Sequence, residues 1–265
     1  MENKIDRKLE ELKKQGLHGL MAHIVIGYPD LAASEKLIFT LADSGADLIE
    51  MQIPFTDPLA DGPTILAANL KALKGGVKVS DCFRFAERVA AKLESVPLLF
   101  MTYINIPFNY GMEAFCRDSQ SAGLSGLIIP DIPPEEHSED YQGLALKHML
   151  HPIYILSPSS TPVRIRIISG LASGFLYCTA RVGITGARAE QVAGLRDFLS
   201  RVRKEVKIPL ALGFGISSAE QVRMASELAE VSVVGSKVID VYNSGADESD
   251  SLKKVGSFIH SLREK

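Results

Sequence analysis

The sequence has few cysteines, and they form no recognisable pattern. Its 265 residues include only Cys82, Cys116 and Cys178. An odd number of cysteines without C-x-x-C spacing argues against a disulfide framework or a cysteine zinc site. We therefore expect reduced thiols and a cytoplasmic location.

A strong charge of either sign is also missing. The chain has 29 Lys and Arg against 32 Asp and Glu, a net charge of −3, so nothing indicates a nucleic-acid or membrane partner. No apolar run reaches the length of a membrane span. The charged N-terminal stretch MENKIDRKLEELKKQG lacks the apolar core of a signal peptide.

Motifs for metals and for the usual cofactors are missing as well. The six histidines show no H-x-x-x-H spacing and no cluster with aspartate. There is no nicotinamide-binding fingerprint, and Lys237, after a glycine-serine turn, reads as a solvated helix lysine rather than a Schiff-base lysine. We expect acid–base chemistry without a cofactor or metal.

What the chain does contain is a regular alternation of short apolar runs and helical patterns. The runs expected to be strands are 19–26, 47–53, 97–102, 126–129, 152–156, 174–178, 209–212 and 231–234. The expected helices are 31–44, 64–74, 80–93, 113–122, 135–148, 162–171, 190–206, 217–228, 236–242 and 251–263. Because the strands are apolar throughout rather than alternating, they are predicted to be buried on both faces, as in a parallel sheet.

Eight such units in a chain of this length favour a closed (β/α)8 TIM barrel over an open sheet. We expect one α/β domain over residues 1–265, with no linker. An additional N-terminal helix is predicted from Ile5, Leu9 and Leu12 and ends at Gly16. Such a helix can plug the bottom of the barrel, and the chemistry is expected at the opposite, carboxyl ends of the strands.

Three acids gather at the end of the second expected strand. Glu50 lies inside the apolar run, and Asp57 and Asp61 follow in a loop rich in proline and glycine. An acid in a buried strand is costly unless it is paired or its pKa shifts, and two carboxyls in different environments suit proton transfer. The alternative is structural: Glu50 pairs with a neighbouring strand, and the two aspartates cap turns.

Three glycine-containing turns follow the sixth, seventh and eighth expected strands, at 183–186, 213–217 and 234–236. Glycine allows backbone N–H groups to approach an anion, and a helix starting at Ser236 would direct its free N–H groups toward it. These loops are where barrels usually hold a substrate phosphate. The turns therefore favour a phosphorylated small molecule, although ordinary strand–helix turns also need glycine.

The acidic loop, E-x-x-x-P-F-T-D-P-L-A-D-G-P-T, resembles that of the tryptophan synthase α chain family. Further matching stretches, in the family's order, are 103–106 (YINI), 130–133 (PDIP), 183–186 (GITG), 213–217 (GFGIS) and 235–236 (GS). The resemblance spans nearly the whole chain. It implies a TIM barrel that splits indole-3-glycerol phosphate into indole and glyceraldehyde 3-phosphate. It also implies a pyridoxal-phosphate β chain as partner, in an α2β2 heterotetramer.

The resemblance assigns roles to particular residues. Glu50 would be the general acid–base that protonates the indole ring, and Asp61 would stabilise the indole nitrogen. The residues implied in substrate binding are Tyr103, Ile128, Ile155, Thr185, Gly186, Phe214, Gly215, Gly235 and Ser236. The loops at 56–61 and around Thr185 would close over the substrate. Asp57, Asn105 and Asp131 would fall in loops facing the β chain.

Several positions depart from the family pattern. Gln52 stands where the family usually has glycine, and His23 stands where an apolar pocket residue is expected. Val182 and the stretch 228–230 also differ. These departures keep two alternatives open: a related barrel enzyme acting on another phosphosugar, and a non-catalytic subunit that only activates a β chain.

Overall fold

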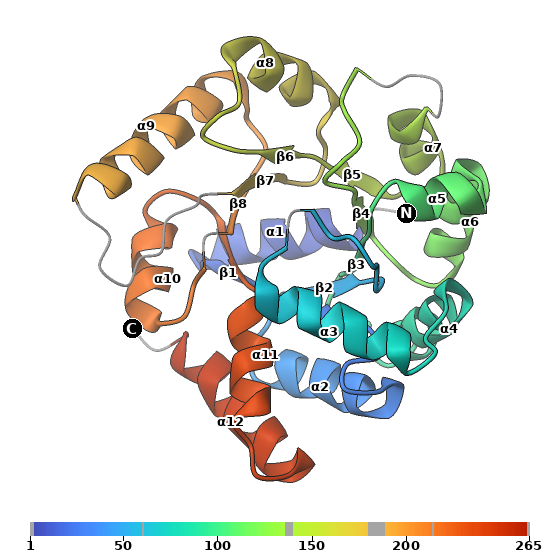
Figure 1. Cartoon of the computed structure of the whole chain (residues 1–265). Coiled ribbons are helices and arrows are strands. Elements are labelled where there is room, and N and C mark those ends of the chain that lie inside the picture. Colours follow the sequence, from blue (N-terminus) through green and yellow to red (C-terminus); the bar gives the residue numbers. More distant parts are fainter. Residues whose placement is uncertain (1–2, 60, 136–139, 180–188, 214, 264–265) are drawn as a thin grey trace.

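The centre of the computed structural model is a parallel sheet that curls into a barrel (Figure 1). The structure describes residues 3–59, 61–135, 140–179, 189–213 and 215–263. The strands are β1 (Gly19–Val25), β2 (Leu48–Gln52), β3 (Leu98–Met101), β4 (Gly126–Ile128), β5 (His151–Ile153), β6 (Ile155–Leu156), β7 (Leu176–Thr179), β8 (Leu210–Gly213) and β9 (Val231–Val234). Their order in the sheet is β5-β4-β3-β2-β1-β9-β8-β7-β6.

The two outermost strands of that order are two parts of one chain run. Only Tyr154 separates β5 from β6, and its carbonyl accepts a hydrogen bond from the Tyr177 amide at 3.0 Å. Because β5 pairs with β4 and β6 pairs with β7, this run joins both ends of the sheet. The predicted barrel of eight strand units is therefore confirmed, with its fifth unit recorded as two short strands.

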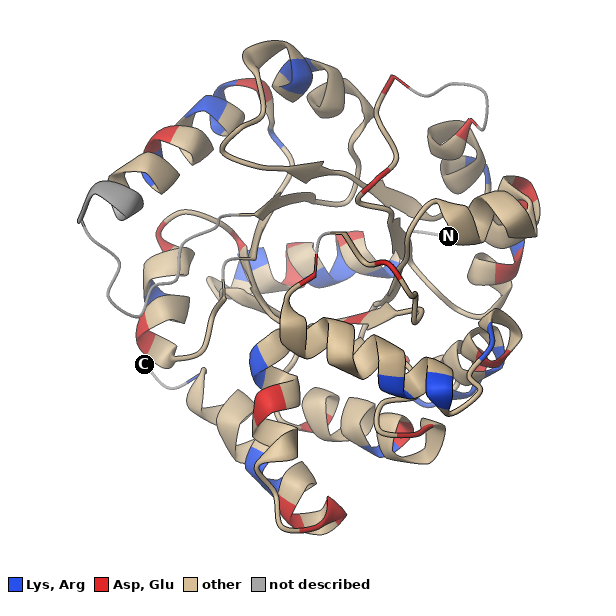
Figure 2. Ribbon diagram, viewed as in Figure 1, with Lys and Arg blue, Asp and Glu red and all other residues tan. Residues whose placement is uncertain are grey.

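Helices cover the barrel: α1 lies across one end of it, and the others form an outer ring (Figure 1). They are α1 (Lys4–Gln15), α2 (Leu31–Asp43), α3 (Pro63–Lys74), α4 (Val79–Ala90), α5 (Asn105–Tyr110), α6 (Met112–Ser121), α7 (Tyr141–Lys147), α8 (Pro162–Leu171), α9 (Ala189–Glu205), α10 (Ala219–Ser226), α11 (Ser236–Asn243) and α12 (Glu248–Ser261). The charged side chains lie mainly on this ring and its loops (Figure 2). No helix within the described ranges is long and apolar enough to cross a membrane.

Two helical segments differ most from the sequence prediction. The short helix α5 was not expected, because it contains Pro107 and is too short to show a helical period. The helix expected over 135–148 is observed only from Tyr141, where the Asp140 carboxylate caps it by accepting a hydrogen bond from the Gly143 amide. Residues 136–139 of that prediction lie outside the described residues.

The N-terminal helix closes one end of the barrel, as its pattern predicted. Asn3 caps α1 by accepting from the Ile5 amide, and Gly16 ends it at a φ of 65°. Ile5 and Leu9 belong to the same apolar cluster as side chains from inside the barrel, among them Met21. In Figure 1 the helix crosses behind the strands, so the other end of the barrel is left for the site.

The alternation of side chains along the strands defines the inner layers. Met21 on β1 belongs to the inner cluster, whereas Ala22 and Ile24 pack outward against the helices. On β2, Leu48 likewise points inward and Ile49 outward. The next inward positions, two residues further along, are therefore His23 and Glu50.

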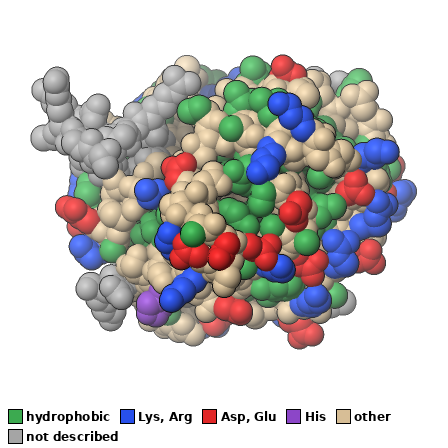
Figure 3. All heavy atoms as spheres, turned by 60° about the horizontal axis from the view of Figure 1, so that its bottom comes forward, with side chains coloured by type: hydrophobic (Ala, Val, Ile, Leu, Met, Phe, Trp, Pro, Cys, Tyr) green, Lys and Arg blue, Asp and Glu red, His purple; other side chains and the backbone are tan. Residues whose placement is uncertain are grey.

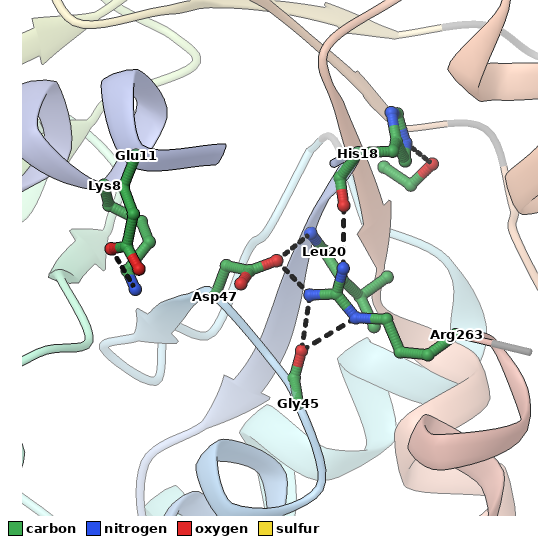
Figure 4. A network of polar contacts seen from close by, with 8 residues as sticks. Lys8, Glu11, His18, Leu20, Gly45, Asp47 and Arg263 are labelled. Carbon is green, nitrogen blue, oxygen red and sulfur yellow. Dashed lines mark hydrogen bonds and ion pairs between the residues drawn. The ribbon is translucent and has the colours of Figure 1, made fainter. Parts of the chain in front are cut away.

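A C-terminal arginine links the last helix to the first strands. Arg263 donates to the carbonyls of His18 (2.7 Å) and Gly45 (3.0 Å) and forms an ion pair with Asp47. Asp47 in turn accepts a hydrogen bond from the Leu20 amide at 2.8 Å (Figure 4). These contacts join segments at opposite ends of the chain and complete the ring around the barrel.

Replacing this arginine should destabilise the fold. In Arg263→Met the side-chain stem remains, but two carbonyls and the half-buried Asp47 lose their charged partner. We expect the free energy of unfolding, measured by urea denaturation followed by circular dichroism, to fall by about 2 kcal/mol.

The matched control is Arg196→Met. Arg196 pairs with Glu227 on the surface, where both side chains are more than half exposed, so removal should change stability by less than about 0.5 kcal/mol. Equal losses in the two variants would contradict a special role for Arg263.

Candidate functional site

A cavity of about 1020 Å³ opens at the carboxyl ends of the strands. Its walls come from the two halves of the barrel: Glu50 from β2, Ile155 from β6, Tyr177 from β7 and Gly213 from β8 all line it. The volume suits a small organic ligand. Helix α1 closes the other end of the barrel. The cavity therefore lies above the apolar side chains that fill the barrel interior.

Glu50 and His23 face each other in this cavity. The pairing of β1 with β2 places them directly opposite, and Nδ1 of His23 lies 3.1 Å from Oε1 of Glu50. Both side chains are almost fully buried, with His23 4% and Glu50 3% exposed. The predicted alternative that Glu50 pairs with a neighbouring strand is thus observed, but the partner is a cavity residue. Glu50 both pairs and lines the site.

Asp61 is held beside this pair by two donors. Its Oδ2 accepts hydrogen bonds from Gln52 Nε2 at 2.7 Å and from the Tyr103 hydroxyl at 3.1 Å. Burial raises the pKa of Asp61, although these two hydrogen bonds and the charge of His23 work against the rise. Asp61 is therefore fixed in position in the loop after β2. It acts as a hydrogen-bond acceptor, and its surroundings differ from those of Glu50.

His23 supplies the only possible positive charge among the described residues that line the cavity, since none of them is Lys or Arg. Burial opposes a charge on the imidazole, but the charge and hydrogen bond of Glu50 and the charge of Asp61 outweigh it and raise the pKa of His23. Burial, and then the charges of Glu50 and Asp61, hold the pKa of Tyr177 well above its usual range. Tyr177 therefore stays a neutral hydroxyl.

Part of the cavity lining is apolar. Ile128 and Ile155, both predicted from the sequence, line it together with Met101 and Val233. Tyr103 is buried, and its ring stacks on Phe55 with ring centroids 5.4 Å apart. Its contact with the site is the hydrogen bond from its hydroxyl to Asp61. These apolar side chains can pack on a flat apolar group.

The glycine turns expected to hold an anion also line the cavity. Gly215, Gly235 and Ser236 all line it, and Ser236 is the first residue of α11. Gly215 has a φ of +76°, which side chains other than glycine rarely adopt. The remaining predicted residues, Thr185, Gly186 and Phe214, lie outside the described residues, as does Val182.

Three residues of the site had no functional assignment from the sequence. Gln52 and His23 stood out only as departures from a family pattern, and the structure shows them bonded to the two carboxylates. Tyr177 was overlooked, although inward alternation along β7 points to it. A Cβ on Gly213 would lie 2.8 Å from the Tyr177 hydroxyl oxygen, so the ring needs glycine at that position.

The described residues contain no group of three or more His, Cys, Asp or Glu side chains placed to hold a metal ion. The reactive groups at the site are two carboxylates, an imidazole and two phenols, next to apolar side chains. Such a set can move a proton and stabilise a developing positive charge.

Comparisons with known proteins agree with this architecture. A family model described as tryptophan synthase alpha chain matches residues 9–264. The tryptophan synthase alpha chain of Syntrophotalea carbinolica is 46% identical over 92% of this chain and 94% of the relative, and that of Desulfotalea psychrophila is 44% identical over 98% and 99%. Tryptophan synthase subunit alpha from Legionella pneumophila superposes with a TM-score of 0.91 at 30% identity, covering 99% of this chain and 98% of that one.

An added carboxylate at the start of α11 should expel an anion from the cavity. In Ser236→Asp the new charge competes for the free N–H groups, while an acid in this position does not disfavour the helix. We expect binding of inorganic phosphate, followed by ³¹P NMR titration, to weaken at least about tenfold. Thr161→Asp, at the start of α8, adds the same charge to another helix start and should leave phosphate binding unchanged. Equal weakening in both variants would contradict a phosphate site at α11.

Proposed function

The chain belongs to the tryptophan synthase alpha chain family, and we propose that it is the carbon–carbon lyase that cleaves indole-3-glycerol phosphate to indole and glyceraldehyde 3-phosphate. One observation carries the proposal: Glu50 and Asp61 line the same cavity as the glycine turns at Gly215 and Gly235. A bicyclic aromatic group could lie beside the two acids, with the phosphate of the same substrate on the glycine turns.

Glu50 is the group that moves the proton. Its carboxylate takes the proton of the hydroxyl on the carbon attached to the indole ring and delivers it to the ring carbon. The carbon–carbon bond then breaks, the oxygen forms the aldehyde, and the bonding electrons return to the ring. The net transfer is one proton from oxygen to carbon, and Glu50 ends as a carboxylate.

Asp61 acts on the indole nitrogen. Protonation of the ring carbon places a positive charge on that nitrogen, and a nearby carboxylate stabilises this charge in the transition state. The hydrogen bonds from Gln52 and Tyr103 to Asp61 support the role, because a carboxylate that is already positioned needs no reorganisation during the reaction.

The remaining predicted residues would bind the two ends of the substrate. Ile128 and Ile155 pack on the indole. Gly215, Gly235 and Ser236 hold the phosphate with backbone N–H groups and the start of α11. For Thr185, Gly186 and Phe214, a substrate-binding role rests on the sequence resemblance alone.

Replacing Glu50 tests the proposed lyase activity. Glu50→Gln keeps the shape of the side chain but cannot carry the proton, so cleavage should fall by about 10³-fold. The purified chain is mixed with indole-3-glycerol phosphate, with and without its cognate β chain, and glyceraldehyde 3-phosphate is measured.

Two results would favour the alternatives. If the unchanged chain binds and activates the β chain but produces no glyceraldehyde 3-phosphate, it is a non-catalytic activating subunit. Cleavage or isomerisation of another phosphosugar, with none of the indole substrate, would indicate a related barrel enzyme. The paired carboxylates favour the lyase over both, since neither alternative requires this pair.

A β chain is the proposed partner, in an α2β2 heterotetramer. Leu59, in the loop after β2, is 85% exposed, and Phe108 on α5 is 59% exposed. Asp131, after β4, accepts a hydrogen bond from the Ile104 amide at 2.9 Å, which ties its loop to the start of α5. The face of the molecule in Figure 3 mixes both charge signs with apolar side chains.

A charge at the loop tip should weaken this association. Leu59→Asp places a carboxylate where an apolar side chain would be buried, so the Kd for the cognate β chain should rise at least about tenfold in isothermal titration calorimetry. The control is Val163→Asp on α8, where Val163 is 58% exposed and outside the proposed interface. A similar loss in both variants would place the interface elsewhere.

We further propose that the protein works in the cytoplasm. All three cysteines are buried free thiols, which fits a reducing compartment.

A further inference from the structure

The contact between His23 and Glu50 has a defined geometry. Strand pairing sets the two residues opposite each other, and Nδ1 of the imidazole lies 3.1 Å from Oε1 of the carboxylate. The other oxygen, Oε2, has no hydrogen-bond partner among the described residues. One oxygen is thus held by the histidine, and the other is available to a substrate.

The charges around the pair require a positive partner. Glu50 and Asp61 are two carboxylates in one cavity, and a buried carboxylate is costly without compensation. The other titratable groups of the described site are Tyr177 from β7 and Tyr103, which follows β3, and neither adds positive charge. Within the described lining, only the imidazole of His23 can compensate the acids.

We propose that His23 is a positioning residue for the lyase reaction, in which its imidazolium compensates the negative charge of the Glu50 carboxylate and orients it toward the hydroxyl proton of the substrate. This inference rests on the proposed function. His23 keeps its own proton throughout: Nδ1–H donates to Oε1, the hydroxyl proton passes to Oε2, and Glu50 then delivers it to the ring carbon. Delivery of that proton returns Glu50 to a carboxylate after every turnover, with the histidine contact unchanged.

The pH profile separates this role from a purely structural one. In His23→Phe the Glu50 carboxylate loses its positive neighbour, while the negative charge of Asp61 remains. The acid limb of kcat/KM for indole-3-glycerol phosphate, measured with the cognate β chain present, should move up by at least about one pH unit. On the plateau kcat should fall about tenfold, with KM changed by less than about threefold, because orientation and not binding is lost.

His23→Gln distinguishes orientation from charge. Its neutral amide can donate to Oε1, so plateau kcat should recover, while the acid limb stays shifted because the positive charge is gone. The matched control is His151→Gln. His151 pairs with Asp6 at 2.9 Å at the closed end of the barrel, so its loss should leave the pH profile of kcat/KM unchanged.

A titration that needs no activity provides a second test. The imidazole of His23, followed by ¹⁵N NMR in the free protein, should lose its proton at lower pH in Glu50→Gln than in the unchanged chain. The same titration midpoint in both proteins would overturn the pairing.

The outcomes for His23 and for the lyase function can be told apart. An unmoved acid limb in an active His23→Phe variant, or a shift of equal size in His151→Gln, overturns the role of His23 alone. Failure of the unchanged chain to cleave the substrate overturns the proposed function and the reaction role of His23 with it. The NMR titration then still reports whether the pair exists.

Discussion

The inward alternation of side chains along parallel strands is the constraint on which this structure depends. Every second residue of every strand must enter the same narrow space, so the barrel interior is built in layers. The layer nearest α1 is filled by apolar side chains such as Met21 and Leu48, together with Ile5 of the helix. One layer higher the same two strands present His23 and Glu50, and the interior changes from dry core to reactive cavity.

That change is tolerable because the polar groups of the upper layer compensate part of one another's burial. Glu50 is opposed by His23, and Asp61 accepts from Gln52 and Tyr103. An unpaired carboxylate in the same place would cost several kcal/mol by order of magnitude. The compensation leaves Oε2 of Glu50 without a partner in the described residues, and an unsatisfied acceptor next to a cavity is what a proton-transfer site requires.

Stability and chemistry are placed at opposite ends of the strands. Around the closed end, Arg263 ties the last helix to the loops before β1 and β2, and His151 pairs with Asp6. Such contacts hold the ring of helices without entering the cavity. At the open end, glycines let the backbone approach a bound anion closely. They also leave room for aromatic rings, as Gly213 does for Tyr177. The barrel can therefore vary its open end without losing its core.

The sequence alone determined the elements with sharp chemical boundaries. The helix over Pro162–Leu171 and the strand over Val231–Val234 were predicted with the observed limits, because proline, glycine and apolar runs mark them locally. It also singled out Glu50 as an acid in a buried strand, and Asp61 as a member of the acidic loop that resembles the family's. Tertiary structure alone decided their partners: His23 meets Glu50 only through the register of β1 with β2, and Tyr177 reaches the site from β7, across the barrel. Those contacts join residues distant in sequence, and closure of the sheet, which no local pattern encodes, brings them together.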